Sequence, residues 1–324
     1  MSDLFSQQSS STLKPIKILL HVVLFIATFF TTTVAGVAWL NHDPFDLNNF
    51  FLGLPYSLAL LFILTSHEFG HYFAARYHKV ETTLPFYIPS PSFPGFLSFG
   101  TFGAVIRTKS RIPTKHAMFD IGVAGPLAGF VATLLILTYG FTHLPDKNFI
   151  LQIHPDYFLP VQETQGVSLS FGTSILYQLL SLLFTDPTSQ FVPPMSEMYH
   201  YPFLCAGWFG LFVTAMNLIP VGQLDGGHLS YTMFGEKHKI ISRVAWGMIF
   251  LFGLVGFLPS LGINIYLGWT GWIFWALVLL FIVKLEHPPV QDEFPLDSTR
   301  MKIGWLTYGI LFLSFAPMPF SILF

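Results

Sequence analysis

Long apolar runs separated by short polar segments dominate the chain. Seven of them approach the 17–25 residues that an α-helix needs to cross a membrane; they cover residues 18–40, 50–77, 117–141, 203–219, 241–258, 265–283 and 303 to the C-terminus. Pro259-Ser260-Leu261-Gly262 joins the fifth and sixth runs, which predicts a tight helical hairpin. The pattern predicts an all-α polytopic membrane protein with about seven transmembrane helices.

The composition supports this fold class. The 324 residues are 52% hydrophobic and only 10% charged, whereas a soluble domain has about 25% charged residues. The net charge is −2 and no long basic run occurs, which argues against nucleic-acid binding. Cys205 is the only cysteine, so any metal site must use histidine and carboxylate ligands. The predicted environment is a lipid bilayer, and no feature indicates an oligomeric state.

The chain is predicted to form one domain. Residues 1–14 are polar and serine-rich, which predicts a disordered cytoplasmic tail. Residues 15–324 then form a single membrane domain, with a core at 50–230 and C-terminal helices at 241–324. The first apolar run is long and lacks a small-residue cleavage site, so it is interpreted as an anchor.

Positive charge predicts the orientation. If the N-terminus is cytoplasmic and every run crosses the membrane, fourteen lysines and arginines lie on the cytoplasmic side and only Lys147 lies outside. This bias also supports the number of crossings. A bacterial inner membrane is expected rather than a plastid, because no transit peptide is visible.

Two connecting segments are too polar or too short to span. Residues 82–111 are rich in proline and glycine, and within them 96–106 combine phenylalanine and β-branched residues with small ones. This composition predicts a small β-hairpin or strand pair at the membrane surface, with an irregular loop as the alternative. On the other side, residues 174–184 predict an interfacial helix.

The second run ends in His67-Glu68-Phe69-Gly70-His71. Histidines four residues apart lie on one face of a helix, so both imidazoles can reach a single metal ion. The carboxylate between them is then placed to act as a general base on a water molecule. A satisfied polar cluster between helices is the alternative, but polar groups in a membrane helix are costly and call for a function.

The third run carries small residues on one face. Gly122, Gly125 and Gly129 are spaced at i, i+3 and i+7, which predicts a close approach between helices. Pro126 predicts a kink in the same helix. Asp120 is expected to be solvated at the surface, with a hydrogen bond to the backbone or to the site as the alternative.

The fourth run ends in a sequence that breaks a helix. Pro220 and three glycines follow Asn217, and they place Asp225 on a turn rather than on a regular helical face. Irregular backbone at membrane depth is tolerated only when protein buries it or when it lines a cavity. The predicted orientation puts this break at the level of His67, where a third metal ligand is needed.

Two motifs carry a resemblance to a known family: His-Glu-x-x-His on one membrane helix and Asn-x-x-Pro-x-x-x-x-Asp-Gly on a later one. With them, the chain resembles the site-2 protease family of intramembrane zinc metalloproteases, in its branch without a PDZ domain. The resemblance covers residues 64–227. It implies that His67, His71 and Asp225 bind one zinc ion per chain and that Glu68 is the catalytic carboxylate. It also implies that Asn217 helps to bind the substrate or the oxyanion, and that the substrate is a membrane-anchored protein.

The remaining histidines carry no predicted role in the site. His228 adjoins Asp225, but the family pattern gives it no function. His78 and His116 are expected at the cytoplasmic boundary. The others show no metal-ligand spacing, so loop or interfacial positions are expected for His21, His42, His143, His154, His200 and His287.

Two other functions remain open from the sequence. A non-catalytic metal-binding membrane protein or divalent-metal transporter would need the ligands but not Glu68, and a transporter would be expected to carry further intramembrane acids. A different membrane metallohydrolase is the third possibility. The family spacing of Asn217 and Asp225 favours the protease.

Overall fold

The computed structural model describes residues 15–91, 98–159, 168–290 and 294–323, and helices form most of it. The helices are α1 (Pro15–Trp39), α2 (Leu54–Tyr77), α3 (Lys115–Thr142), α4 (Lys147–Ile153), α5 (Ile175–Phe184), α6 (Pro202–Leu218), α7 (Asp225–Phe234), α8 (His238–Val255), α9 (Gly271–Val278) and α10 (Ser298–Ser314). The strands are β1 (Phe86–Pro89), β2 (Thr101–Val105), β3 (Ser168–Phe171) and β4 (Phe320–Leu323). The prediction of a mainly helical protein is confirmed for these residues.

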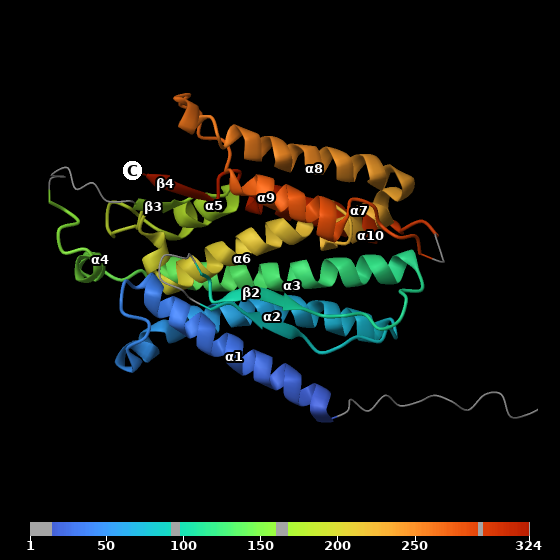
Figure 1. Ribbon diagram of the computed structural model, residues 1–324, viewed down its shortest axis with the longest axis horizontal. Helices are drawn as coiled ribbons and strands as arrows, with labels where there is room; N and C mark the ends of the chain where they lie inside the picture. Colours follow the sequence, from blue (N-terminus) through green and yellow to red (C-terminus); the bar gives the residue numbers. More distant parts are fainter. Residues whose placement is uncertain (1–14, 92–97, 160–167, 291–293, 324) are drawn as a thin grey trace, which may run out of the picture.

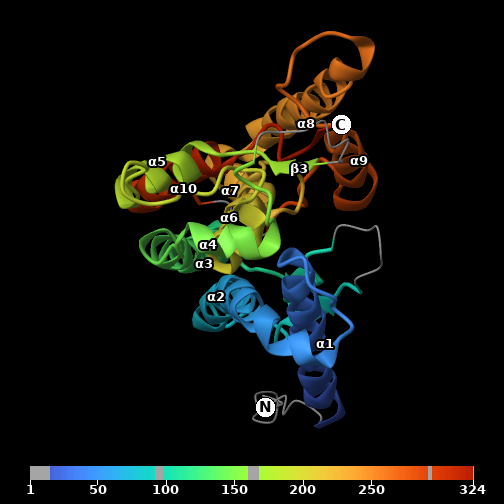
Figure 2. The same cartoon turned by 90° about the vertical axis from the view of Figure 1, so that its left-hand side faces the viewer.

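The long helices run in alternating directions along one axis (Figure 1). We call one end of the molecule the basic end; there α2 and α6 end, and α3, α8 and α10 begin. The name refers to Arg76, Lys115, Lys239 and Arg300, which belong to those helix termini. α4, α5 and the β3–β4 pair lie at the opposite end. α2, α3 and α6 pack against one another in the middle of the molecule, with α1 beside α2 (Figure 2).

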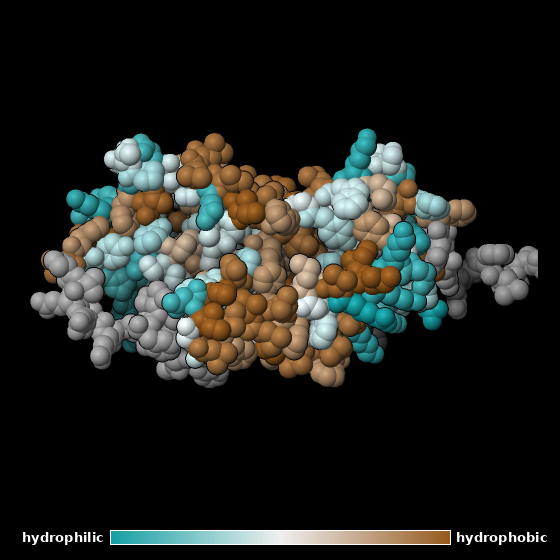
Figure 3. Space-filling model, turned by 90° about the horizontal axis from the view of Figure 1, so that it is seen from above, coloured by the Kyte–Doolittle hydropathy of each residue, from teal (hydrophilic) through white to brown (hydrophobic). Residues whose placement is uncertain are grey.

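The outer surface of the bundle fits a bilayer. Four helical stretches of the described residues are long and apolar enough to cross a membrane: Ile18–Trp39, Leu47–Tyr77, Lys115–Thr142 and Asp225–Leu261. Apolar side chains gather across the middle of the face in Figure 3, and hydrophilic ones gather at its two ends. Val244, Met248 and Leu251 of α8 are more than half exposed. The chain is an integral membrane protein.

The last two predicted spans are shorter as helices than expected. The run at 265–283 becomes helical only at Gly271, where α9 begins and continues as the π-helical Leu279–Val283. The residues before it include Gly268, whose backbone packs directly on the Phe252 carbonyl of α8. α10 ends at Ser314 because Pro317 and Pro319 follow, and proline cannot donate an amide hydrogen bond. The expectation of a helix from 303 to the C-terminus was therefore wrong.

The predicted strand pair is present, although its partner was not foreseen. β2 falls within 96–106 and pairs antiparallel with β1, matching Phe86 to Val105 and Tyr87 to Ala104. Residues 96 and 97 lie outside the described part of the chain. The Tyr87 hydroxyl lies 2.8 Å from Thr65 Oγ1, so the sheet is fixed against α2. The alternative of an irregular loop is wrong for Thr101–Val105.

A second sheet at the opposite end had no sequence signal. β3 pairs antiparallel with β4, which joins residues 168–171 to 320–323. Its Phe171 and Phe320 rings pack against Trp208 of α6, with centroids 4.7 and 5.4 Å away. Nearby, Ser174 accepts a hydrogen bond from the Tyr177 amide at 3.2 Å and so caps α5. The helix predicted at 174–184 is confirmed as α5.

Candidate metal centre

Three of the predicted site residues meet between α2 and α7. His67 and His71 lie one turn apart on α2, and Asp225 is the first residue of α7. The two Nε2 atoms are 3.1 Å apart. Asp225 Oδ2 is 3.4 Å from His67 Nε2, and its Oδ1 is 3.4 Å from His71 Nε2. All three side chains are mostly buried, so the groups face one another away from solvent.

These separations fit one metal ion. Ligands about 2.0–2.1 Å from a tetrahedral zinc ion lie about 3.3 Å from each other. The observed distances of 3.1 and 3.4 Å are close to that value, and the Asp225 carboxylate faces both imidazoles, with Oδ2 toward His67 and Oδ1 toward His71. Two imidazoles and one carboxylate are also a common ligand set of catalytic zinc, which leaves a fourth position for water or substrate.

The break after α6 brings Asp225 to the histidines. α6 ends at Leu218, and a turn over residues 220–224 leads directly into α7. Gly226 allows this return, because a Cβ at that position would overlap the Leu218 carbonyl. The predicted turn therefore precedes Asp225, which itself begins the next helix.

The His71 ring is held in one tautomer. Its Nδ1 lies 2.7 Å from the Ile121 carbonyl oxygen of α3. A carbonyl only accepts, so Nδ1 must carry the proton, and a neutral ring then presents the lone pair of Nε2 to the site. Such a contact to the second nitrogen is typical of metal-binding histidines. No sequence pattern pointed to Ile121.

The glycines of α3 make room for both imidazoles. A Cβ at Gly125 would overlap the His71 ring, and one at Gly129 would lie against the His67 side chain. The spacing of these glycines predicted only a close approach of helices. In the structure, the His71 side chain occupies the space beside Gly125, and the His67 side chain occupies the space beside Gly129.

Gly125→Ala is therefore expected to lower zinc affinity at least about tenfold, because its methyl group would displace the His71 ring from Asp225. Gly122→Ala is the matched control on the same helix, since the nearest atom to its Cβ would be His228 Cβ at 3.2 Å. Zinc content after dialysis against competing chelator measures both variants. Equal zinc affinity in both variants would contradict this role of Gly125.

Glu68 and Asn217 lie beside the three candidate ligands. Glu68 is 6% exposed, and the Ile106 backbone directly after β2 is within hydrogen-bonding reach of its carboxyl group. Asn217 Nδ2 is 3.4 Å from His67 Nε2. The site thus combines three candidate ligand residues, a buried carboxyl group and an amide donor, and these groups are suited to the hydrolysis of a carbonyl compound.

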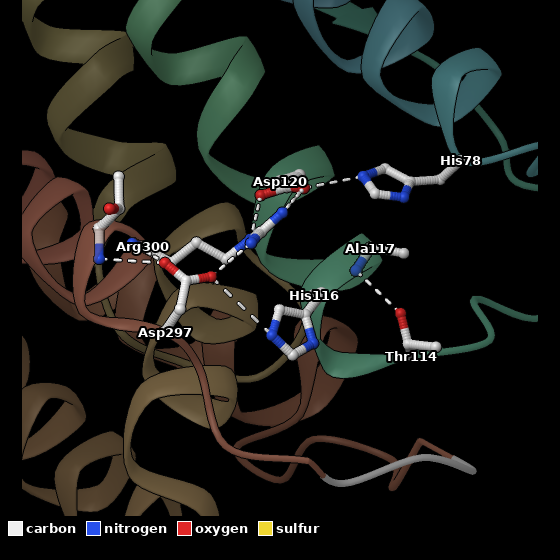
Figure 4. A network of polar contacts seen from close by, with 8 residues as sticks. His78, Thr114, His116, Ala117, Asp120, Asp297 and Arg300 are labelled. Atoms are coloured by element: carbon white, nitrogen blue, oxygen red, sulfur yellow. Dashed lines mark hydrogen bonds and ion pairs between the residues drawn. The ribbon is translucent and has the colours of Figure 1, made fainter.

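Asp120 is not simply solvated at the surface, contrary to expectation. Arg300 of α10 donates to both of its oxygens, from Nε at 2.8 Å and Nη2 at 2.7 Å, and His78 Nε2 lies 2.8 Å from Oδ2 (Figure 4). Backbone and side-chain hydrogen bonds from Arg300 also lower the pKa of Asp297 to about 2. This network joins α2, α3 and α10 at the basic end and does not include the metal ligands.

Several other histidines also differ from expectation. His228 Nδ1 is 2.7 Å from His287 Nε2, and His287 is buried rather than placed on a loop surface. His21 is buried on α1, with Nδ1 3.0 Å from the Pro85 carbonyl. His116 lies 4.0 Å from Asp297 at the basic end, as expected of a boundary residue.

Comparison with known proteins identifies the family. Residues 55–258, which contain every site residue above, match the family described as Peptidase family M50. The chain is 32% identical over 240 residues to "Probable zinc metalloprotease EGY1, chloroplastic" of Oryza sativa subsp. japonica, covering 74% of this chain and 36% of that protein. It is 29% identical to the protein of the same name from Arabidopsis thaliana, covering 82% and 43%.

A third relative is "Probable zinc metalloprotease EGY2, chloroplastic" of Arabidopsis thaliana, at 24% identity over 83% of this chain and 42% of that protein. The chain thus spans less than half the length of these relatives. No solved structure matches. The family expected from the two motifs is confirmed: this chain belongs to peptidase family M50.

Proposed function

We propose that this protein is an intramembrane zinc endopeptidase that hydrolyses a peptide bond within or near a transmembrane segment of a membrane-anchored protein. One observation carries the proposal. Two imidazoles and a carboxylate from separate helices converge at 3.1–3.4 Å, with Glu68 buried on the same helix, inside a bundle of membrane-spanning length.

The roles of the residues follow from their chemistry. His67, His71 and Asp225 would hold the zinc ion, which when bound supplies a water of lowered pKa and polarises a carbonyl group. Glu68 takes the proton of the attacking water and delivers it to the amide nitrogen that leaves. The Asn217 amide donates a hydrogen bond to the carbonyl oxygen as negative charge develops on it.

The proposal includes seven crossings, formed by α1, α2, α3, α6, α8, α9 and α10, in a single domain over residues 15–324. With the N-terminus in the cytoplasm, the basic end faces the cytoplasm, in keeping with the distribution of lysine and arginine. The active site then lies toward that side. The relatives are named chloroplastic, so nothing in them supports the bacterial inner membrane expected from the sequence.

We further propose that the free edge of the β1–β2 sheet binds the substrate as an added strand. A helical peptide bond is shielded by its own hydrogen bonds, so the substrate must unwind before hydrolysis. β2 leads directly to Ile106 beside Glu68, and Phe102 of β2 is 68% exposed. Main-chain hydrogen bonds to a sheet edge would hold the unwound segment extended at the site.

Ala104→Pro is expected to reduce cleavage about tenfold or more without loss of zinc, because proline removes a strand amide. Thr101 is a less suitable position for proline, because its hydroxyl already donates a hydrogen bond to the Ile88 carbonyl at 2.9 Å inside the sheet. Ala104→Val keeps the amide and serves as the control. Unchanged cleavage by Ala104→Pro would exclude strand addition here.

Metal dependence tests the proposed activity itself. Purified protein in detergent is incubated with a single-span membrane peptide before and after treatment with a chelator, and products are identified by mass. We expect cleavage to stop on chelation and to return when zinc alone is restored. Cleavage that continues in metal-free protein would contradict the proposal.

A further inference from the structure

A second group of metal-ligating side chains meets at the opposite end of the molecule. His154 directly follows α4, and Glu197 precedes the short 3-10 helix Met198–His200. His154 Nε2 is 3.1 Å from His200 Nε2 and 3.4 Å from Glu197 Oε2. His200 Nε2 is 3.7 Å from the same oxygen. We call His154, Glu197 and His200 the distal cluster; its members come together from two segments 46 residues apart.

The distances within the distal cluster fit a metal ion as well as those of the catalytic centre do. In both groups the two Nε2 atoms are 3.1 Å apart. A circle through the three distal atoms has a radius of about 2.0 Å, so an ion about 2.0–2.1 Å from each of them has a place close to their plane.

One imidazole of the distal cluster is oriented in the same way as the catalytic His71. His200 Nδ1 lies 2.5 Å from the carbonyl oxygen of Trp39 at the end of α1. The carbonyl only accepts, so Nδ1 carries the proton and the lone pair of Nε2 on the neutral ring points at the cluster. His200 is 3% exposed, so this orientation is fixed by packing.

One oxygen of the carboxylate in the distal cluster has no hydrogen-bond donor in the described part of the chain. Glu197 Oε2 is buried without a hydrogen-bond partner among the described residues, and the same holds for the nearby Tyr201 hydroxyl. A buried carboxylate oxygen without a partner is costly. A hydrogen bond between the two histidines alone leaves this oxygen unmatched, whereas a cation at the centre satisfies it. The His154 side chain is 36% exposed, which gives an ion access from solvent.

We propose that His154, Glu197 and His200 form a second divalent-metal site, separate from the catalytic centre and suited to zinc. Two imidazoles and one carboxylate are typical zinc ligands and leave a fourth position open. The bound ion joins the end of α4 to the segment that begins α6, and through the Trp39 carbonyl it also fixes the end of α1. In the orientation proposed above, this site lies on the side of the membrane opposite to catalysis.

Zinc stoichiometry of the purified full chain tests this site. The protein is stripped of metal, reloaded with zinc alone and freed of excess zinc. We expect about two zinc ions per chain in wild type, about one in Glu197→Gln and about one in Asp225→Asn. His154→Gln is a second variant, in case Glu197→Gln does not fold. His143→Ala, which changes an exposed histidine near the same end, should keep both ions.

Thermal unfolding gives a readout that does not depend on proteolysis. Because a ligand that binds only the folded state stabilises it, zinc should raise the melting temperature of Asp225→Asn through the distal site. The double variant Asp225→Asn, Glu197→Gln should show no such rise. About one zinc ion in wild type that Asp225→Asn removes completely would overturn the proposal, as would two ions retained in both Glu197→Gln and His154→Gln.

Discussion

Glu68→Gln is expected to reduce peptide cleavage by about 10²–10⁴-fold while the zinc content stays at the wild-type level. Glutamine has nearly the same shape but cannot accept the proton of the attacking water, and general-base catalysis contributes about that factor. Glu68 is not one of the three proposed ligands, so metal binding should persist. Cleavage rates and zinc content are measured on the same preparations.

Glu81→Gln is the matched control, because Glu81 follows the same helix but is exposed. It should cleave at the wild-type rate. A Glu68→Gln variant that cleaves as fast as wild type would remove the general base from the mechanism. It would also return the protein to the alternative of a metal-binding protein without catalysis.

Asp225→Asn is expected to lose the zinc ion of the catalytic centre together with cleavage, while the distal cluster keeps its own ion. Each oxygen of Asp225 lies 3.4 Å from one histidine Nε2, and the neutral amide replaces a charged ligand by a weaker one. Loss of a residue that only hydrogen-bonds to a metal ligand already lowers metal affinity about 10–100-fold. Loss of a ligand itself should therefore lower zinc affinity more than about a hundredfold. Equilibrium dialysis against zinc buffers measures the affinity, and excess zinc should restore part of the cleavage.

Asp120→Asn tests whether any acid near the basic end has the same effect. Asp120 binds Arg300 and His78 and lies outside the ligand set, so its variant should keep zinc affinity and lose stability instead. If Asp120→Asn weakened zinc binding as much as Asp225→Asn, the assignment of Asp225 would be wrong.

The parts of the fold that periodicity and charge control could be predicted from the sequence. The apolar run at 50–77 became α2 with His67 and His71 on one face, and Pro220 ended the helix that precedes Asp225. Both depend on local properties, namely helix spacing and the missing amide of proline. The family motif then joined two half-sites that local patterns alone could not pair.

Long-range contacts account for what could not be predicted. The pairing of β3 with β4 depends on segments about 150 residues apart, and short apolar strands carry no signal of their partner. His154 and His200 showed no ligand spacing because the fold, and not the sequence, brings them together. Ile121 orients His71 through its carbonyl group, which every residue possesses.

The position of the cut in a single-span substrate, determined by mass spectrometry after reconstitution into lipid vesicles, tests the central claim most directly. The account predicts that wild type cleaves one or a few bonds within the apolar segment or at its edge, and that Glu68→Gln yields none of these products. Cleavage confined to the soluble flanks, or identical products from both proteins, would contradict it.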